Sequence, residues 1–393
     1  MNELTIEQVR LNHLRKQHAL DKKRPDFYEI AKTQLGLHST DYWTPYLSVW
    51  ARIGDYDART VFNSLNRGDR LLRLNAFRTT VHVVHIDNLS MLIHATQSVF
   101  YRKIRQHPDI RHLSDNELES LKETILATLE DGPKTMREIK KLVPEHARQI
   151  RPLFHLAATS GEVIRATANH ARSSTTAYAL LEKWVEGFRL DDMSEDDALD
   201  QVMHMYIDRF GPVSINDMSW WLSTTKSRAK AAVEAFDDIV AVEMAGKSKL
   251  MTSSDIDHAA SLEPPSEPVI WLLPYEDHLP KAFIDRSWYL SDKMKSRVFP
   301  KLREHYWPPK CPPPPTDVKV TGATNASGEI RPTIWTNGEI AGRWELEKNG
   351  MEYRISYSVF RKVHAKYGNM ISERARELED FVNTRLVPIS RTN

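Results

Sequence analysis

Apolar and polar positions follow a helical period over the first part of the chain and then a strand period. The helical period predicts helices over residues 6–20, 27–37, 44–53 and 57–66. Residues 71–74 and 79–85 have the β-branched alternation that is typical of a strand pair. Because helices followed by a β-ribbon are characteristic of a winged helix, we predict one in this region.

The same order of elements recurs twice further along the chain. Residues 132–139 and 211–218 both begin with Gly-Pro and carry an N-cap hydroxyl with an acidic residue three positions later. Long helices are predicted before the two copies, over residues 115–129 and 197–210, and second helices after them, over 145–160 and 225–236. Strand pairs follow, over 163–166 with 176–179 and over 239–243 with 249–251. The repeat predicts two tandem winged helices, and the N-terminal pattern adds a third.

The composition changes after Thr252. Residues 253–268 are polar and Pro-rich, which predicts a linker. Short strands are predicted over 269–273, 330–335 and 339–345, with a hairpin at Asn337-Gly338, and a charged helix over 356–385. The run from Pro308 to Pro315 predicts a stiff exposed loop. These elements indicate a small β-rich C-terminal domain.

Composition and charge narrow the class of protein. The chain has 393 residues, enough for several domains, and 54 Lys and Arg nearly balance 53 Asp and Glu, so any basic surface must be local. The single cysteine, Cys311, excludes an intrachain disulfide and a Cys-rich zinc site, which fits a reducing cytoplasm. We find no signal-peptide core and no apolar run of the roughly 20 residues that a membrane span needs, so we expect a cytoplasmic protein.

Common catalytic motifs are missing from the sequence. There is no G-x-x-x-x-G-K-[ST] phosphate loop, no G-x-G-x-x-G after a strand and no H-E-x-x-H, so nucleotide-hydrolase and zinc-protease functions lose support. The 16 histidines are scattered, and we interpret them as satisfied or surface side chains rather than metal ligands.

Tandem winged helices point instead to nucleic acid, because their recognition helices place Lys and Arg toward phosphates. The candidate phosphate-binding residues are Arg102, Lys103, Arg105, Arg148, Arg151, Lys226, Arg228 and Lys230. A solvated helix face is the alternative interpretation, and winged helices also serve as protein-interaction modules.

Several sequence blocks resemble the winged-helix DNA glycosylases of the AlkZ-like and YcaQ-like superfamily. The first blocks are Leu37-His38-Ser39-Thr40-Asp41, Tyr46-Leu47-Ser48-Val49-Trp50-Ala51-Arg52 and Arg78-Thr79-Thr80-Val81-His82. Later blocks in family order are Phe210-Gly211-Pro212, Trp220-Trp221, Leu272-Leu273-Pro274-Tyr275-Glu276-Asp277-His278-Leu279, Asp285-Arg286-Ser287 and Pro332-Thr333-Ile334-Trp335 with Gly338 and Gly342 to Trp344. The resemblance therefore spans nearly the whole chain.

The resemblance implies a mainly α fold with β, in the α+β class. It predicts three winged helices over residues 1–110, 111–190 and 191–255, and a C-terminal β-barrel with a terminal helix over 256–393. Family members excise damaged bases, typically cationic N-alkylpurines, and some unhook interstrand crosslinks. We therefore expect a metal-independent, monofunctional DNA glycosylase that needs no cofactor and acts on duplex DNA carrying a modified base.

The catalytic motif of the family, Gln-x-Gln or Gln-x-Asp, aligns with His38-Ser39-Thr40, so this sequence departs from it at both positions. His38 could orient or deprotonate the attacking water, or assist a leaving base when protonated, since its ordinary pKa of about 6.5 lies near working pH. Thr40 could hold the water by a hydrogen bond. Asp41, or else Asp55 or Asp57, could supply the missing carboxylate.

Further residues are candidates for the base pocket. Large rings can stack on an extruded base or fill the gap it leaves. The ring candidates are Tyr42, Trp43, Trp220, Trp221 and Trp335, and Arg78 and His82 are candidates to support the pocket.

Two functional hypotheses follow. The first is a divergent glycosylase for an alkylated, crosslinked or bulky, enzymatically modified base such as those in phage DNA, with a role in repair or antiviral defence. It would be associated with the nucleoid and need neither a membrane nor an obligate protein partner. The second is a non-catalytic winged-helix DNA-binding protein, a regulator or structure-specific binder, in which His38 and Thr40 only cap and pack a helix.

Overall fold

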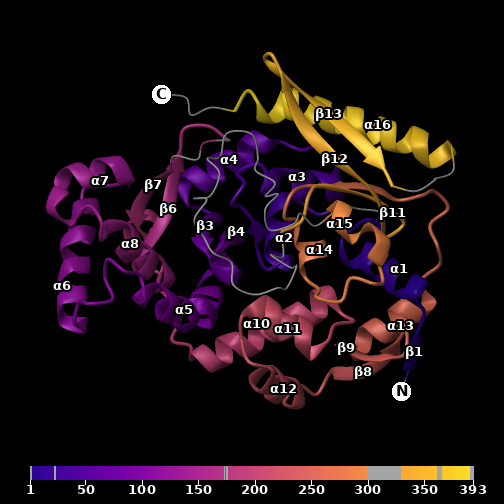
Figure 1. Cartoon of the computed structure of the whole chain (residues 1–393), viewed down its shortest axis with the longest axis horizontal. Coiled ribbons are helices and arrows are strands. Elements are labelled where there is room, and N and C mark those ends of the chain that lie inside the picture. The colour runs from indigo at the N-terminus through magenta and orange to yellow at the C-terminus, as the bar shows by residue number, and fades with distance from the viewer. Residues whose placement is uncertain are drawn as a thin grey trace.

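The computed structural model describes residues 2–21, 24–171, 173, 176–298, 329–360 and 365–389 (Figure 1). The fold is mainly α with β, as the sequence predicts. The run from Pro308 to Pro315, with Cys311, lies outside the described residues. In the part of the chain that the structure describes, no helix has both the length and the apolar character to cross a bilayer.

The N-terminal region contains the predicted helices and strand pair. The helices are α1 (Ile6–Lys16), α2 (Phe27–Thr33), α3 (Thr44–Ile53) and α4 (Ala58–Arg67). They precede the antiparallel strands β3 (Leu71–Asn75) and β4 (Val81–His85). Helix α5 (Leu89–Arg105) then leads to the next region.

The helix predicted over 27–37 is shorter than expected, and this difference positions His38. It ends at Thr33 because Leu35 and Gly36 take left-handed backbone conformations, with φ of 58° and 96°. The chain then forms the short strand β2 (Leu37–His38), which pairs with β4.

The repeated order of elements is confirmed. In the first copy it is α6 (Asp115–Leu126), α7 (Met136–Leu142), α8 (Ile150–Thr159), β6 (Val163–Ala168) and β7 (Thr176–Leu180). In the second it is α10 (Glu195–Phe210), α11 (Ile215–Leu222), α12 (Lys226–Glu234), β8 (Ile239–Met244) and β9 (Lys247–Thr252). The predicted N-cap pairs form capping boxes at the starts of α7 and α11, Thr135 with Glu138 and Ser214 with Asp217.

The sheets join these regions to one another. One six-stranded sheet has the order β2-β4-β3-β6-β7-β5, where β5 is Lys134–Thr135, and it is continuous because Arg73 of β3 pairs with Arg165 of β6. A second sheet has the order β1-β8-β9, and in it β1 (Asn2–Leu4) pairs in parallel with β8. The N-terminal strand therefore completes a sheet of the third region, and domain boundaries at residues 110, 190 and 255 stay a prediction.

The predicted linker over 253–268 was wrong in its first half, which forms helix α13 (Ser253–Ser261). Asp255 of this helix is buried and accepts a hydrogen bond of 2.5 Å from Arg15, and it also pairs with Lys16. These ion pairs to α1 stabilise a polar segment that its own sequence does not mark as helical. The prolines follow only after the helix ends.

The C-terminal region forms a four-stranded antiparallel sheet of β10 (Ile270–Leu273), β11 (Thr333–Thr336), β12 (Glu339–Asn349) and β13 (Glu352–Val359). Helix α16 (Ala365–Phe381) packs against it, as Figure 1 shows at the top of the view. The helix predicted over 356–385 therefore starts too early, because residues 356–359 extend the long β12–β13 ladder. A closed β-barrel stays a prediction, since residues 299–328 lie outside the described part.

A buried ion pair joins the N-terminal and C-terminal regions. The Arg52 side chain of α3 donates to both carboxylate oxygens of Asp277, at 2.8 and 2.9 Å, and both side chains are only 1% exposed. Burial alone would raise the pKa of Asp277, but the guanidinium holds it below its usual value. Arg52 also donates to Gln17 and to the Ser48 carbonyl, so each of its nitrogens has a partner.

We expect Arg52→Ala to cost about 3–5 kcal/mol of unfolding free energy, because it leaves the Asp277 carboxylate buried without its counter-charge. Urea denaturation followed by circular dichroism measures the loss. Arg385→Ala is the matched control, since it breaks an exposed Arg–Asp pair with Asp55, and its midpoint should stay that of the wild type. Equal midpoints for the two variants would contradict the role given to the buried pair.

Candidate active site

A cavity of about 300 Å³ lies where the N-terminal, third and C-terminal regions meet. Its lining residues are His38, Thr40, Phe77, Arg78, Thr80, His82, Trp221, Tyr275, Glu276, His278, Lys281 and Glu329. The cavity holds two formal cations, Arg78 and Lys281, and two carboxylates, Glu276 and Glu329. We call it the site cavity.

Strand β2 places His38 in this cavity. His38 lies opposite His82 in the β2–β4 register, and the Ser39 N–H donates to the Val81 carbonyl at 2.7 Å. Gly36 permits this close approach, because a Cβ there would lie 2.8 Å from a Val84 methyl group and its φ is positive. A turn that only glycine accommodates therefore fixes where the imidazole lies.

Three buried histidines form one wall of the site cavity. The ring of His82 lies 5.6 Å from that of His38 and 5.2 Å from that of His278, centroid to centroid. The His82 Nδ1–H donates to the Thr80 carbonyl at 3.0 Å. Within the described residues, no three potential ligands are arranged to hold a metal ion.

Burial keeps these histidines neutral near pH 7. Burial, and then the nearby Lys281 ammonium, lower the pKa of His38 well below 6.5. Burial also lowers the pKa of His82 well below 6.5 and that of His278 to about 4. His38 in the free protein is therefore suited to contact water as a neutral imidazole, and it is poorly suited to donate a proton to a leaving base.

The Glu276 carboxylate lies beside His38 in the site cavity. One carboxylate oxygen lies 3.7 Å from His38 Nε2 and forms an ion pair with Lys281, and the other accepts a hydrogen bond of 2.7 Å from the Ile330 N–H. The residue has a left-handed backbone with φ of 61° and is buried. Its only sequence signal was its place in the block Leu272 to Leu279, directly before His278.

Further polar groups line the site cavity besides His38 and Glu276. Thr40 is exposed and contributes a hydroxyl at the rim. The Tyr275 hydroxyl donates to Glu329 at 3.1 Å, and burial raises the pKa of Tyr275, so the phenol stays neutral. The Thr44 hydroxyl donates to the Tyr275 carbonyl at 2.9 Å and anchors this segment to α3.

Arg78 occupies the edge of the site cavity in a strained conformation. Its φ of 54° and ψ of 29° are left-handed, which costs a residue with a side chain roughly 1–3 kcal/mol. Its guanidinium carbon lies 4.2 Å from the ring centroid of Trp220, and that of Arg286 lies 5.7 Å from the same ring. The stacked rings of Phe77 and Trp221, 4.0 Å apart, form an apolar wall nearby.

The structure thus brings together His38, Thr40, Arg78, His82 and Trp221 of the predicted site residues. It places the predicted carboxylates elsewhere. Asp41 accepts a hydrogen bond of 2.8 Å from the Trp43 N–H at the start of α3. Asp55 pairs with Arg385 at 2.9 Å, and Asp57 caps α4. None of these three lines the site cavity.

Three of the ring candidates pack away from the site cavity. Trp43 is buried with its ring 5.1 Å from that of Tyr353. Trp335 is buried and stacks on Tyr289 at 5.1 Å. Tyr42 lies beside the Arg73 guanidinium, 5.7 Å from its carbon to the ring centroid. These rings contribute to packing in this structure rather than to the wall of the cavity.

The basic candidates differ in their surroundings. Arg228 pairs with Asp196 at 3.0 Å and Asp200 at 2.6 Å, and Lys230 lies 3.6 Å from Glu234. Arg105 donates to main-chain carbonyls, including that of Ile110 at 3.0 Å. The side chains of Arg102, Arg148, Lys226 and Lys230 are exposed, as are those of Lys103 and Arg151. Lys103 and Arg151 line a second cavity, of about 380 Å³.

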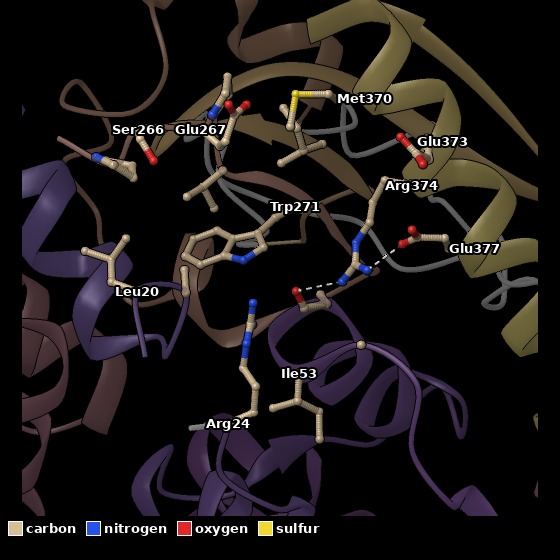
Figure 2. A pocket seen from close by; sticks show the side chains of 17 residues that line it. Leu20, Arg24, Ile53, Ser266, Glu267, Trp271, Met370, Glu373, Arg374 and Glu377 are labelled. Carbon is tan, nitrogen blue, oxygen red and sulfur yellow. Dashed lines mark hydrogen bonds and ion pairs between the residues drawn. The ribbon is translucent and has the colours of Figure 1, made fainter. Parts of the chain in front are cut away.

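A larger cavity, of about 540 Å³, lies between the end of α3 and α16 (Figure 2). Figure 2 shows Trp271 at its centre, with Arg24 and Arg374 pointing inward from opposite sides. The Arg374 side chain donates to Glu377 at 2.7 Å and to the Trp50 carbonyl at 3.2 Å, and Arg24 donates to the Arg52 carbonyl. Because these arginines hold main-chain groups, we interpret this larger cavity as a packing feature and keep the site cavity as the candidate active site.

Comparisons with known proteins agree with the sequence blocks. The model of the family described as DNA glycosylase AlkZ-like matches residues 32–382, which include every residue that lines the site cavity. Among solved structures, the chain is similar to the Streptomyces sahachiroi DNA glycosylase AlkZ, with a TM-score of 0.73 and 17% sequence identity, over 99% of this chain and 98% of that chain. At this identity the likeness shows a shared fold. No curated protein matches the chain.

The histidine wall predicts a loss of stability in acid. The folded-state pKa of His278 is about 4, whereas the unfolded value is about 6.5. Between these values the unfolded chain binds one more proton, so stability falls as pH falls through this window, by about 3 kcal/mol for this residue. In urea denaturation at pH 7 and pH 4.5, His278→Gln should lose less stability on acidification than the wild type.

His112→Gln is the control for that measurement, because His112 is exposed. It should follow the wild-type pH dependence. The same acid sensitivity in both variants would contradict a neutral, buried His278.

Proposed function

The chain belongs to the AlkZ-like DNA glycosylase family, and from this premise we propose that it hydrolyses the N-glycosidic bond of a modified base in duplex DNA, leaving an abasic site. The observation that carries the proposal is the proximity of Glu276 and His38, two buried side chains whose nearest polar atoms lie 3.7 Å apart in the site cavity. His38 belongs to the tripeptide that aligns with the catalytic motif of the family. Glu276 thus takes the part that the missing motif carboxamide or carboxylate would play.

The proposed reaction begins with extrusion of the target nucleotide into the site cavity, because the glycosidic bond is inaccessible inside a duplex. The volume of about 300 Å³ is at the small end of ligand pockets, which suits one nucleobase. The stacked Phe77 and Trp221 rings provide an apolar wall for it. Arg78 at the cavity edge would contact the extruded nucleotide or its neighbouring phosphate.

Bond cleavage sends the glycosidic electron pair to the leaving base and leaves positive charge on the sugar. The Glu276 carboxylate is placed to stabilise such an oxocarbenium-like state, as carboxylates do in glycoside hydrolysis. A water molecule can hydrogen-bond to both Glu276 and His38, since the two atoms are 3.7 Å apart. The water oxygen bonds to the sugar C1′, and its proton passes to Glu276 or to neutral His38.

Lys281 and Thr40 support this pair. The ion pair with Lys281 fixes the orientation of the Glu276 carboxylate. The Thr40 hydroxyl at the rim can hold the water by a hydrogen bond but cannot act as a base. The neutral histidines cannot protonate the leaving base. We therefore favour a substrate whose base leaves without protonation, such as a cationic N-alkylpurine, which departs as a neutral molecule.

We expect Glu276→Gln to lower the single-turnover rate of base excision by a factor of about 100 or more, because an amide cannot accept the water proton. His38→Ala should also lower it. The assay is alkaline cleavage at abasic sites, on duplexes carrying an N-alkylpurine, an interstrand crosslink or a modified cytosine. The duplex affinity of Glu276→Gln should stay that of the wild type.

Asp41→Asn is the matched control, since asparagine also accepts the hydrogen bond from the Trp43 N–H and this side chain does not line the site cavity. Its rate should be unchanged. A wild-type rate in Glu276→Gln would overturn the role given to that carboxylate. If the wild type bound DNA and left every substrate intact, the non-catalytic DNA-binding hypothesis would take its place.

The pH dependence of excision tests the state of His38. Since its pKa is lowered well below 6.5, the imidazole is already neutral at pH 6.5 and stays so until the solution is distinctly more acidic. The single-turnover rate on an N-alkylpurine duplex should therefore be flat from pH 8 to pH 6.5 and fall only below that range. A rate that rises as pH falls through 6.5 would indicate that protonated His38 acts as an acid.

A further inference from the structure

The second cavity, of about 380 Å³, lies between the last turns of α5 and helix α8. Its basic lining residues are Lys103, His107, Arg151 and His155, and no carboxylate lines it. Helices α5 and α8 pack against each other, with α8 also against β3. We call it the anion cavity, because every charged or titratable side chain in its wall is basic.

Arg151 distinguishes this cavity from the other basic positions. Its side chain is exposed at the cavity and, within the described residues, forms no ion pair, whereas Arg228 on α12 is held by two aspartates. Lys103 lines the same cavity and has an exposed side chain. The Arg151 guanidinium and the Lys103 ammonium line one cavity, and both groups can donate hydrogen bonds to the oxygens of a phosphate group.

His155 lies in the wall of the anion cavity, among basic groups. Burial, and then Arg165, Arg151 and His107, lower its pKa to about 4. Every charged group in that set is basic, and each disfavours a further positive charge. A bound anion would relieve this repulsion, which agrees with the composition of the wall.

The anion cavity lies next to the site cavity along the chain. Asn75, the last residue of β3, lines the anion cavity, and Phe77 lines the site cavity. Two residues span at most about 7 Å between Cα atoms. The two cavities therefore flank the same β3–β4 turn, which also carries Arg78.

We propose that the anion cavity binds one backbone phosphate of the DNA strand from which the base is extruded, with Lys103 and Arg151 contacting the phosphate oxygens. The inference rests on the proposed function only in taking duplex DNA as the ligand. It adds a positioning site: a phosphate held here places the adjoining nucleotide against the β3–β4 turn, from which it enters the site cavity. Among the basic candidates, it assigns this contact to Lys103 and Arg151 rather than to Arg228 and Lys230.

The first test is the salt dependence of binding to a duplex with a stable abasic-site analogue, which needs no catalysis. Each neutralised phosphate contributes about 0.9 to the slope of log affinity against log salt. The double variant Lys103→Ala with Arg151→Ala should lose about one unit of slope. Between 50 and 200 mM salt, its affinity should then change about threefold less than that of the wild type.

Arg228→Ala with Lys230→Ala is the matched control, since both side chains pair with carboxylates on the protein. Its slope should equal that of the wild type. An unchanged slope in the anion-cavity variant would overturn the proposal. The side chains of Lys103, Arg151 and Lys230 are exposed and that of Arg228 is half-buried, and thermal melting should show that both double variants fold as the wild type does.

The second test locates the phosphate. Duplexes with a neutral methylphosphonate at one position at a time, around the abasic analogue, remove single phosphate charges. Wild-type affinity should fall at one position on the analogue strand, and Arg151→Ala should show no further loss there. If Arg151→Ala lost as much affinity as the wild type at every position, the proposal would fail, whether or not the protein excises bases.

Discussion

The buried ion pair between Arg52 and Asp277 is the interaction on which the site depends. Two charges that are each 1% exposed tolerate little displacement, because separating them in a medium of low polarity costs several kcal/mol. Arg52 lies on α3, and His38 lies on the strand shortly before that helix. Asp277 directly follows Glu276. The pair therefore holds the carboxylate and the imidazole against each other from two distant parts of the chain.

The formal charges that line the site cavity cancel, since two cations face two carboxylates, and each charged group has a fixed position. Lys281 pairs with the carboxylate, and the three histidines beside it are uncharged because burial lowers the pKa of each. Such a site holds the Glu276 carboxylate in one orientation, next to histidines that carry no proton to give to a leaving base. This arrangement suits a reaction in which positive charge develops on the sugar and the base leaves by itself. It also explains how a site with His38 and Thr40 could work without the amides of the family motif.

The β3–β4 turn connects the chemistry to the proposed path of the DNA. Phe77 and Arg78 face the site cavity, while Asn75 faces the anion cavity. The left-handed conformation of Arg78 is held by its surroundings, with the guanidinium against Trp220. Strain at such a position is common where a structure must present a side chain in one orientation.

The sequence by itself determined the features that depend on a few neighbouring residues. Helical period, the capping boxes at Thr135 and Ser214, and the Asn337-Gly338 hairpin are local, so the fold class and the repeat followed from them. The sequence blocks likewise gave His38, Thr40, Arg78 and His82 as candidates, and these residues line one cavity because they lie on one sheet or its turns.

Only the tertiary structure decided which carboxylate meets His38. Asp41 accepts a hydrogen bond from the Trp43 N–H, Asp55 pairs with Arg385 and Asp57 caps α4. Glu276, far away in the sequence, is positioned beside His38 by the Arg52–Asp277 pair. The same reason accounts for helix α13, which is stabilised by ion pairs to α1. Capping hydrogen bonds and the helical period involve residues a few positions apart, so they can be recognised in the sequence. Contacts between distant segments depend on how the whole chain packs.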